Sequence, residues 1–265
     1  MNRENITFFY SWFYDYVKKY QSADFEVHRN IELKQLHTIN VCENIKLIGK
    51  SLDLQENDLY IAEAIALFHD IGRFEQFRKY NTFNDRISEN HALLGVRILK
   101  EGGVLSSLPE KKQDIILKAI KYHNLAELPR DEDAECLFFS KLVRDADKLD
   151  VLDVITGYYK NREKDPNPSL DFGLSDLPYY SNEFIEDILN SRVSKNRDFK
   201  TINDFKLFYL CWVFDINFPF TLSRIYEKRY IEKIIGTMPD EENISKIYRH
   251  LKNYIEKHLK NKPVN

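Results

Sequence analysis

Four of the seven histidines lie on apolar faces of predicted helices, where an imidazole is expected to point inward. They are His37, His69, His91 and His123. A neutral imidazole buried without a partner costs on the order of 1–3 kcal/mol, and one shared metal ion satisfies several imidazoles at once. The placement therefore favours a common metal site over four separate core histidines. The remaining three, His28, His250 and His258, lie among charged residues and are expected at the surface.

Carboxylates accompany these histidines. Asp70 follows His69 directly in "AIALFHDIGRF", at the end of the most apolar predicted helix. The segment "RDADKLDVLD" adds Asp145, Asp147, Asp150 and Asp153. Surface exposure explains some of these acids, since one flank of their helix must face water, but it does not easily explain all of them. Imidazole and carboxylate together suit iron, manganese, zinc or nickel, and the absence of nearby cysteine disfavours a structural zinc site.

Helices must position these side chains, because apolar residues recur at three- and four-residue intervals and strand-like alternation is nearly absent. The predicted helices cover 5–20, 31–50, 57–70, 88–100, 110–123, 134–160, 182–192, 201–217, 219–236 and 240–260. Gly72 is expected to end the third of these helices. The sequence therefore predicts an all-α fold.

The predicted organisation is a single all-α domain over 1–265, with a metal-binding core at 25–160. A C-terminal helical extension at 161–265 is expected to pack on that core. The stretch after Tyr159 is rich in Pro, Asp and Gly, which indicates a long irregular connection. It is either a lid over the site or a plain surface crossing.

Composition excludes several classes of protein. The formal net charge is −3, from 39 basic and 42 acidic residues, so no strong field draws the chain to nucleic acid or to an anionic membrane. No apolar segment approaches the roughly 20 residues needed to cross a bilayer, and the N-terminus does not resemble a signal peptide. The three cysteines are far apart and form no CxxC, which suits a reduced compartment. A cytoplasmic protein is expected.

The ordered set of His37, His69, Asp70 and the aspartate of "DADKLD" resembles the H…HD…D signature of the HD-domain metal-dependent phosphohydrolases. "RDADKLD" is similar to the final "ADxL" segment of that family, which implies Asp147 as the metal ligand. Periodicity alone does not choose between Asp145 and Asp147. The resemblance implies that His37, His69 and Asp147 bind one divalent metal ion.

Two further matches resemble the HD members that hold two metals. "ENHALLGVRIL" is similar to their His-containing helix with Gly four residues later, and "IKYHNL" to their next histidine. The resemblance, which covers about residues 30 to 157, implies His91 and His123 as ligands of a second ion and Asp70 as the bridge. The cyclic-dinucleotide branch has paired histidines and a Gly-Tyr-Pro motif, which "YHNLAELP" lacks. The single-metal branches lack a match to both extra histidines.

Substrate phosphate needs cations beside the metals. Arg73 stands one turn after the His-Asp pair, and Lys148 follows Asp147 directly, so both are candidate substrate-binding residues, although exposed surface charge explains either one equally well. Three weaker candidates are Arg86, Arg97 and Arg144. Residues 74–90 should lie at the mouth of the site. There Asn81, Thr82, Asn84 and Asp85 could contact a base or sugar, or could serve only turn formation.

The resemblance implies a hydrolase that cleaves a phosphomonoester, phosphoanhydride or phosphodiester bond of a small nucleotide-like molecule with a metal-activated water, and Asp70 is then the catalytic residue. One or two divalent ions per chain are expected, from manganese, iron, nickel, cobalt or zinc, with magnesium as a further option. Two alternatives stay open: a regulatory or sensor module without turnover, and a di-iron oxygenase on the same scaffold. Oligomeric state is left open.

Overall fold

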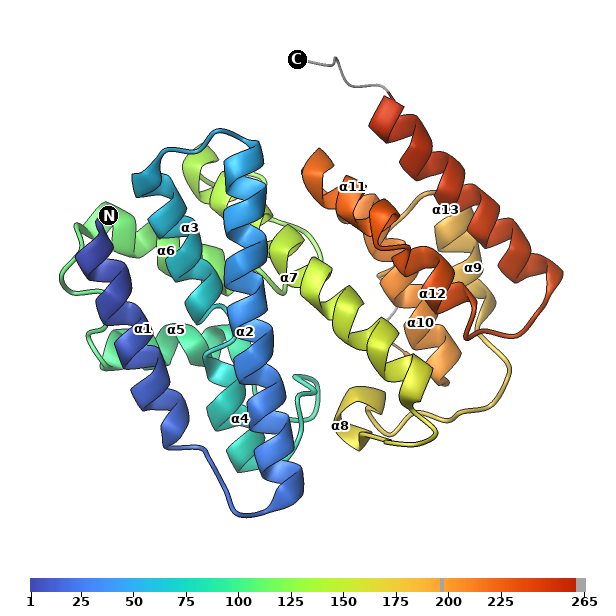
Figure 1. Ribbon diagram of the computed structural model, residues 1–265, viewed down its shortest axis with the longest axis horizontal. Helices are drawn as coiled ribbons and strands as arrows, with labels where there is room; N and C mark the ends of the chain where they lie inside the picture. Colours follow the sequence, from blue (N-terminus) through green and yellow to red (C-terminus); the bar gives the residue numbers. More distant parts are fainter. Residues whose placement is uncertain (196–197, 261–265) are drawn as a thin grey trace. The chain divides into compact units, whose positions relative to one another are not determined.

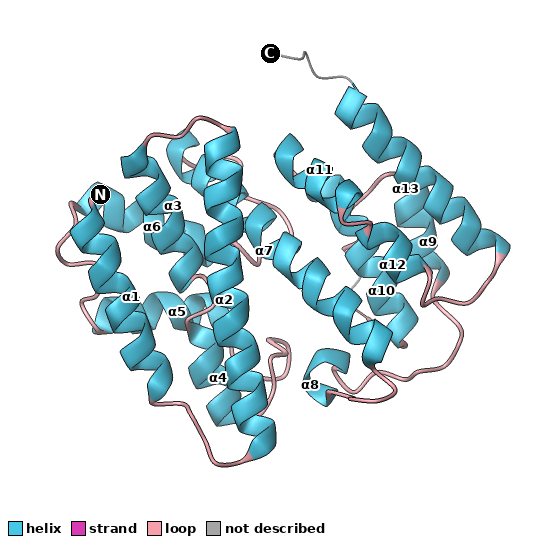
Figure 2. Ribbon diagram, in the orientation of Figure 1, coloured by secondary structure: helices cyan, strands magenta, loops and turns pink. Residues whose placement is uncertain are grey.

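The computed structural model describes residues 1–195 and 198–260 and is helical throughout (Figures 1 and 2). Within these residues the only β-type pairing is an isolated bridge between Ser175 and Thr201. The all-α fold expected from the sequence is confirmed. The chain divides into two compact units, Met1–Asp150 and Val151–Asn265, and each is described here by itself.

The first unit is built around one apolar helix. Its helices are α1 (Arg3–Lys18), α2 (Phe25–Ser51), α3 (Glu56–Phe68), α4 (Gly72–Tyr80), α5 (His91–Glu101), α6 (Glu110–Tyr122) and the first part of α7 (Ala134–Asn161). Every residue of α3 from Ile61 to Phe68 is buried. This helix packs against α1, α2 and α6, because a helix that is apolar on all sides needs neighbours on all sides (Figure 1). This is the helix predicted from the sequence as the most apolar.

Only three residues separate α3 from the next helix. The helix ends at Phe68 rather than at residue 70, and α4 begins at Gly72. Gly72 therefore lies past the end of a helix, as expected, but it also begins a helix over 72–80 that the sequence did not predict. Glycine is needed here for close packing: a Cβ on Gly72 would lie 2.2 Å from the carbonyl oxygen of His91 and 2.8 Å from the nitrogen of Gly95. The first turn of α4 and the first turn of α5 are thereby brought into backbone contact.

The second unit contains the C-terminal part of α7 and a set of shorter helices. They are α8 (Pro168–Asp171), α9 (Asn182–Leu189), α10 (Ile202–Cys211), the 3₁₀ helix η1 (Trp212–Asp215), α11 (Pro219–Glu227), α12 (Tyr230–Ile235) and α13 (Glu242–Lys260). All ten residues of α10 are buried, and this helix contacts α9 and α12. The continuous helix predicted over 219–236 was wrong, because Arg229 adopts a left-handed conformation, with φ 56°, that separates α11 from α12.

The irregular connection after α7 is largely as expected, although it includes the short helix α8. Whether it acts as a lid stays a prediction. The single-domain organisation, with its core ending at 160 and its extension packed on that core, likewise stays a prediction; the boundary between the two units falls inside α7, between residues 150 and 151. None of the helices in the described part of the chain is long and apolar enough to cross a membrane.

We predict that Gly72→Ala lowers the free energy of unfolding by about 1–3 kcal/mol or more, since overpacking against backbone cannot be relieved by a side-chain rotation. Gly157→Ala is the matched control. Gly157 also lies in a helix, but nothing lies within 4 Å of the Cβ position there. That variant should be as stable as the natural protein or up to about 1 kcal/mol more stable. Denaturant unfolding measures both, and equal stability of the two variants would contradict the close packing of α4 on α5.

Candidate metal centre

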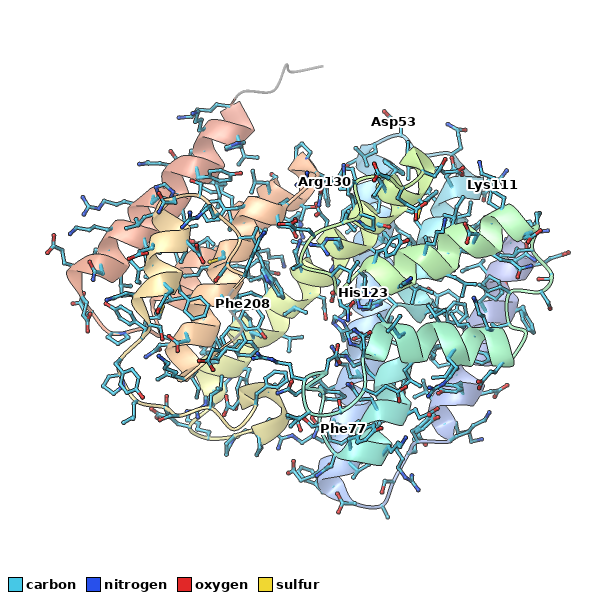
Figure 3. The ribbon with its side chains drawn as sticks, turned by 180° about the vertical axis from the view of Figure 1, so that it is seen from behind. Asp53, Phe77, Lys111, His123, Arg130 and Phe208 are labelled. Atoms are coloured by element: carbon cyan, nitrogen blue, oxygen red, sulfur yellow. The ribbon has the colours of Figure 1, made fainter. Side chains whose placement is uncertain are left out.

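The structure brings the six expected ligand residues together in the first unit. Their ligand atoms form three overlapping groups, each with all atoms within 4.8 Å of one another. The groups are His37, His69 and Asp70; Asp70, His91 and His123; and His69, His123 and Asp147. All except Asp147 are buried. Figure 3 labels His123, which directly follows α6. These groups could hold metal ions.

Asp70 lies between two pairs of histidines. Its Oδ2 atom is 3.5 Å from His37 Nε2 and 3.7 Å from His69 Nε2. Its Oδ1 atom is 3.3 Å from His91 Nε2 and 3.7 Å from His123 Nε2. One carboxylate therefore presents a separate oxygen to each imidazole pair, as a residue shared by two ions must.

Asp147 joins the Oδ2 side of this arrangement. Its Oδ1 atom is 3.2 Å from His37 Nε2 and 3.8 Å from His69 Nε2. Asp145, the alternative that periodicity left open, is fully buried and does not occur in the three ligand groups. The geometry therefore brings to the cluster the same aspartate that the "ADxL" resemblance implies.

Two of the histidines are oriented by the helix that carries them. His69 directly follows α3, and its Nδ1 donates to the carbonyl oxygen of Ala66 at 2.7 Å. His123 directly follows α6, and its Nδ1 donates to the carbonyl oxygen of Ile120 at 2.6 Å. A carbonyl oxygen only accepts, so each Nδ1 carries the ring proton and each Nε2 is left with a lone pair. Both lone pairs are then available to a metal.

The other two histidines are oriented by carboxylates. His37 Nδ1 lies 2.6 Å from Asp150 Oδ2, and His91 Nδ1 lies 2.7 Å from Asp85 Oδ2. A carboxylate on the outer nitrogen fixes the ring and raises the basicity of the inner nitrogen, as is usual around metal-binding histidines. Neither role is apparent from the sequence. Asp150 lies three residues after Asp147, on the same side of α7, and that spacing was the only signal available for it.

Burial controls the protonation of the cluster. It lowers the pKa of His69 to about 4 and that of His91 to about 3, so both imidazoles are neutral near pH 7. Burial and the charge of Lys34 also oppose protonation of His37, but hydrogen bonds to Asp147 and Asp150 outweigh them and raise the pKa of His37 to about 9. Burial disfavours the carboxylate form of Asp70. The charges of Lys34 and Arg73, with that of His69 when it is protonated, nevertheless hold the pKa of Asp70 well below its usual range.

The donor set fits a bound cation. His91 Nε2 and His123 Nε2 lie 2.9 Å apart. The Nδ1 atom of each ring faces an acceptor and so carries the ring proton, which leaves a lone pair on each Nε2 atom. Two lone pairs that face each other repel, and a shared cation converts the repulsion into two bonds. Nitrogens about 2.1 Å from one ion lie about 3 Å apart when they occupy adjacent corners of an octahedral shell. The observed separation agrees with that value.

Lys34 is a site residue that the sequence analysis missed. Its Nζ lies 2.8 Å from Asp70 Oδ2 and 5.4 Å from the centre of the Phe83 ring. It precedes His37 by three residues on α2, which places both side chains on one face of the helix. That spacing was visible in the sequence, but a lysine on a helix was not distinguishable from an ordinary surface charge.

The two expected substrate-binding cations differ from expectation. Arg73 Nη1 donates to Gln76 Oε1, to the carbonyl oxygen of Phe83 and to Asp85 Oδ1, and Arg73 Nε lies 3.4 Å from Asp70 Oδ1. One end of this guanidinium therefore holds the segment after α4, and the other faces the bridging carboxylate. Lys148 is buried on α7, with 7% of its surface exposed. Substrate binding by either residue stays a prediction.

The helical fold and the His/Asp cluster together define a metal-binding helical domain. Residues 36–152 match the family model of the HD domain, and this range includes all six expected ligands. This match confirms that residues 36–152 resemble the HD-domain superfamily of metal-dependent phosphohydrolases. Neither the curated proteins nor the solved structures gave a match to this chain.

We predict that the natural protein, stripped with a chelator and reloaded with Mn²⁺, binds two ions, whereas His91→Ala and His123→Ala each bind one. The Nε2 atoms of these two histidines lie 3.3 Å and 3.7 Å from Asp70 Oδ1. His28→Ala is the matched control, because His28 lies on α2 with half of its side chain exposed and pairs with Glu32. Metal analysis after gel filtration gives the stoichiometry.

Chelation should also lower the melting temperature of the natural protein, because an ion that binds only the folded state stabilises it. Two ions retained by both site variants would show that His91 and His123 are core histidines.

Proposed function

We propose that this protein is a two-metal phosphohydrolase that cleaves a phosphate ester or anhydride bond of a small nucleotide-like molecule. The proposal rests on the position of the Asp70 carboxylate. Its Oδ2 atom faces His37 and His69, and its Oδ1 atom faces His91 and His123. A single structural ion would need one such pair of histidines. Two ions held about 3.5–4 Å apart are the arrangement that polarises phosphate, activates water and neutralises the leaving oxygen.

The residues of the chain hold these charges in place. His37, His69 and Asp147 would bind one ion, His91 and His123 the other, and Asp70 both. Asp70 is suited to the bridge because its low pKa keeps both oxygens ionised near pH 7. Manganese, iron, nickel, cobalt and zinc all accept this imidazole and carboxylate set, and magnesium is a weaker fit because it favours oxygen ligands.

Lys34 is the protein cation that we assign to the substrate phosphate. Its side chain is 17% exposed, and its ammonium already lies at the Oδ2 edge of Asp70. When Asp70 shares its charge with metal ions, the attraction that holds the ammonium on this carboxylate weakens, and the ammonium can turn to a phosphate oxygen. Arg73 is less suited to this task, because its Nη1 group is committed to the segment after α4.

The partners that we propose follow from this chemistry. A small phosphorylated substrate suits a site whose polar groups are side chains in the interior of one helical unit. The near-neutral net charge offers no general attraction for nucleic acid or for an anionic membrane. A cytoplasmic location stays the expectation.

The first test is a screen of nucleotides, dinucleotides and sugar phosphates against protein loaded separately with Mn²⁺, Fe²⁺, Co²⁺ and Ni²⁺. We expect phosphate release from at least one nucleotide-like compound, and a loss of at least 10³-fold in Asp70→Asn because the bridge is neutralised. Asp15→Asn, a change of an exposed acid on α1, should retain full activity. Bound metal without turnover of any phosphate compound would contradict the proposal and favour a sensor or an oxygenase.

Lys34→Met should lower kcat/KM by about 10–100-fold, because one charge-assisted hydrogen bond to phosphate is lost. Lys34→Arg should recover part of that loss, and the metal content of both variants should equal that of the natural protein. Lys50→Met, at an exposed position of the same helix, is the control. Unchanged kcat/KM in Lys34→Met would remove Lys34 from the phosphate site.

A further inference from the structure

Asp85 connects the segment between α4 and α5 to three neighbouring elements. Its Oδ1 atom accepts hydrogen bonds from Arg73 Nη1 at 2.9 Å and from Gln76 Nε2 at 2.8 Å, both on α4. Its Oδ2 atom accepts from His91 Nδ1, the first residue of α5, at 2.7 Å. The same oxygen accepts from Asn124 Nδ2, just after α6, at 3.2 Å. Donors therefore reach both oxygens of this carboxylate from three directions.

The same segment, residues 81–90, is fastened to α4 at further points. Gln76 is fully buried, and its Nε2 group also donates to Ser88 Oγ and to the carbonyl oxygen of Glu89. Phe83 is buried with its ring centre 4.6 Å from that of Phe77, a residue labelled in Figure 3. Asp85 is the member of this segment whose side chain extends the network to a candidate metal ligand.

His91 needs this contact because of its position in its helix. His69 and His123 follow the last turn of a helix, so a backbone carbonyl three residues earlier accepts their outer proton. His91 begins α5 and has no earlier turn of that helix to use. Its Nδ1 proton is held instead by Asp85, a side chain of the preceding segment. The orientation of this imidazole therefore depends on the conformation of residues 81–90.

We infer that Asp85 is a positioning residue that couples the conformation of residues 81–90 to the second cation site. It holds the Nε2 atom of His91 toward Asp70 Oδ1, and the same carboxylate ties the segment to Arg73, Gln76 and Asn124. This inference rests on the proposed two-metal site. It gives Asp85 a role beyond turn formation and beyond contact with a base or sugar.

The coupling must act in both directions. If the order of residues 81–90 favours a cation on His91 and His123, then that cation favours the order of residues 81–90 by the same factor. The segment offers a direct reporter, because Arg86 and Ile87 are both exposed and trypsin cleaves after arginine. Cation binding should therefore slow cleavage between these two residues.

The experiment compares the natural protein with Asp85→Asn, Asp85→Ala and Glu89→Gln. Glu89 is the matched control: it lies in the same segment and loses the same charge, but its carboxylate pairs with Arg97 rather than with His91. Mn²⁺ binding is titrated after chelator treatment. Trypsin cleavage after Arg86 is followed by mass spectrometry with and without Mn²⁺, and far-UV circular dichroism verifies folding.

We expect the natural protein and Glu89→Gln to bind two Mn²⁺ ions and to be cleaved after Arg86 more slowly when Mn²⁺ is present. Both Asp85 variants should retain the first ion, bind the second about 10–100-fold more weakly, and be cleaved rapidly whether or not the first site is filled. Asp85→Asn keeps the shape of the side chain. If Asp85→Ala does not fold, Asp85→Asn alone gives the affinity for the second ion and the rate of cleavage after Arg86.

Three results would overturn the inference. Unchanged affinity for the second ion in a folded Asp85 variant would show that His91 does not need this carboxylate. Faster cleavage without a change in ion affinity would show that Asp85 serves the segment alone. In both cases two ions bound to the natural protein would leave the proposed function standing, whereas a natural protein that binds no Mn²⁺ would remove the proposed function and the inference together.

Discussion

The buried carboxylate of Asp70, which has donors or cations beside both of its oxygens, is the constraint on which the first unit depends. Asp70 is 3% exposed and remains ionised, and an isolated charge in such a position is strongly unfavourable. Its oxygens are therefore surrounded by donors and cations: Lys34 on the Oδ2 side, Arg73 on the Oδ1 side and four imidazoles between them. Metal ions are the partners that would compensate this charge most completely. Four histidines from different parts of the chain must converge on one residue for the arrangement to exist.

Helix ends, more than helix faces, produce that convergence. His69 and His123 each follow the last residue of a helix, and His91 is the first residue of one. An imidazole at a helix end can use a backbone carbonyl to fix its tautomer, while its second nitrogen faces the interior. The backbone contact between α4 and α5, which Gly72 permits, brings the start of α5 close to His69 and Asp70, the residues between α3 and α4. His91 reaches Asp70 for that reason.

Much of the fold and of the candidate site was predictable. Periodicity indicated the helices that carry the ligands, because long amphipathic or wholly apolar runs are the strongest local signal. It failed at 72–80, where a glycine that usually ends helices begins one because a neighbouring backbone lies against it. It failed again at Arg229, where a left-handed residue without a sequence signal divides a helix. The first of these boundaries depends on a tertiary contact, which periodicity does not encode.

The sequence by itself determined the all-α class, the order of the ligand residues and the choice of imidazole and carboxylate, because residue type and helical spacing need no tertiary information. Only the tertiary structure decided which oxygen of Asp70 faces which imidazole pair. It also decided that Lys34 lies on that carboxylate, that Arg73 holds the segment after α4, and that Asp85 orients His91. Periodicity places a side chain on a helix face, but distances of 2.6–3.7 Å between helices depend on how the helices pack.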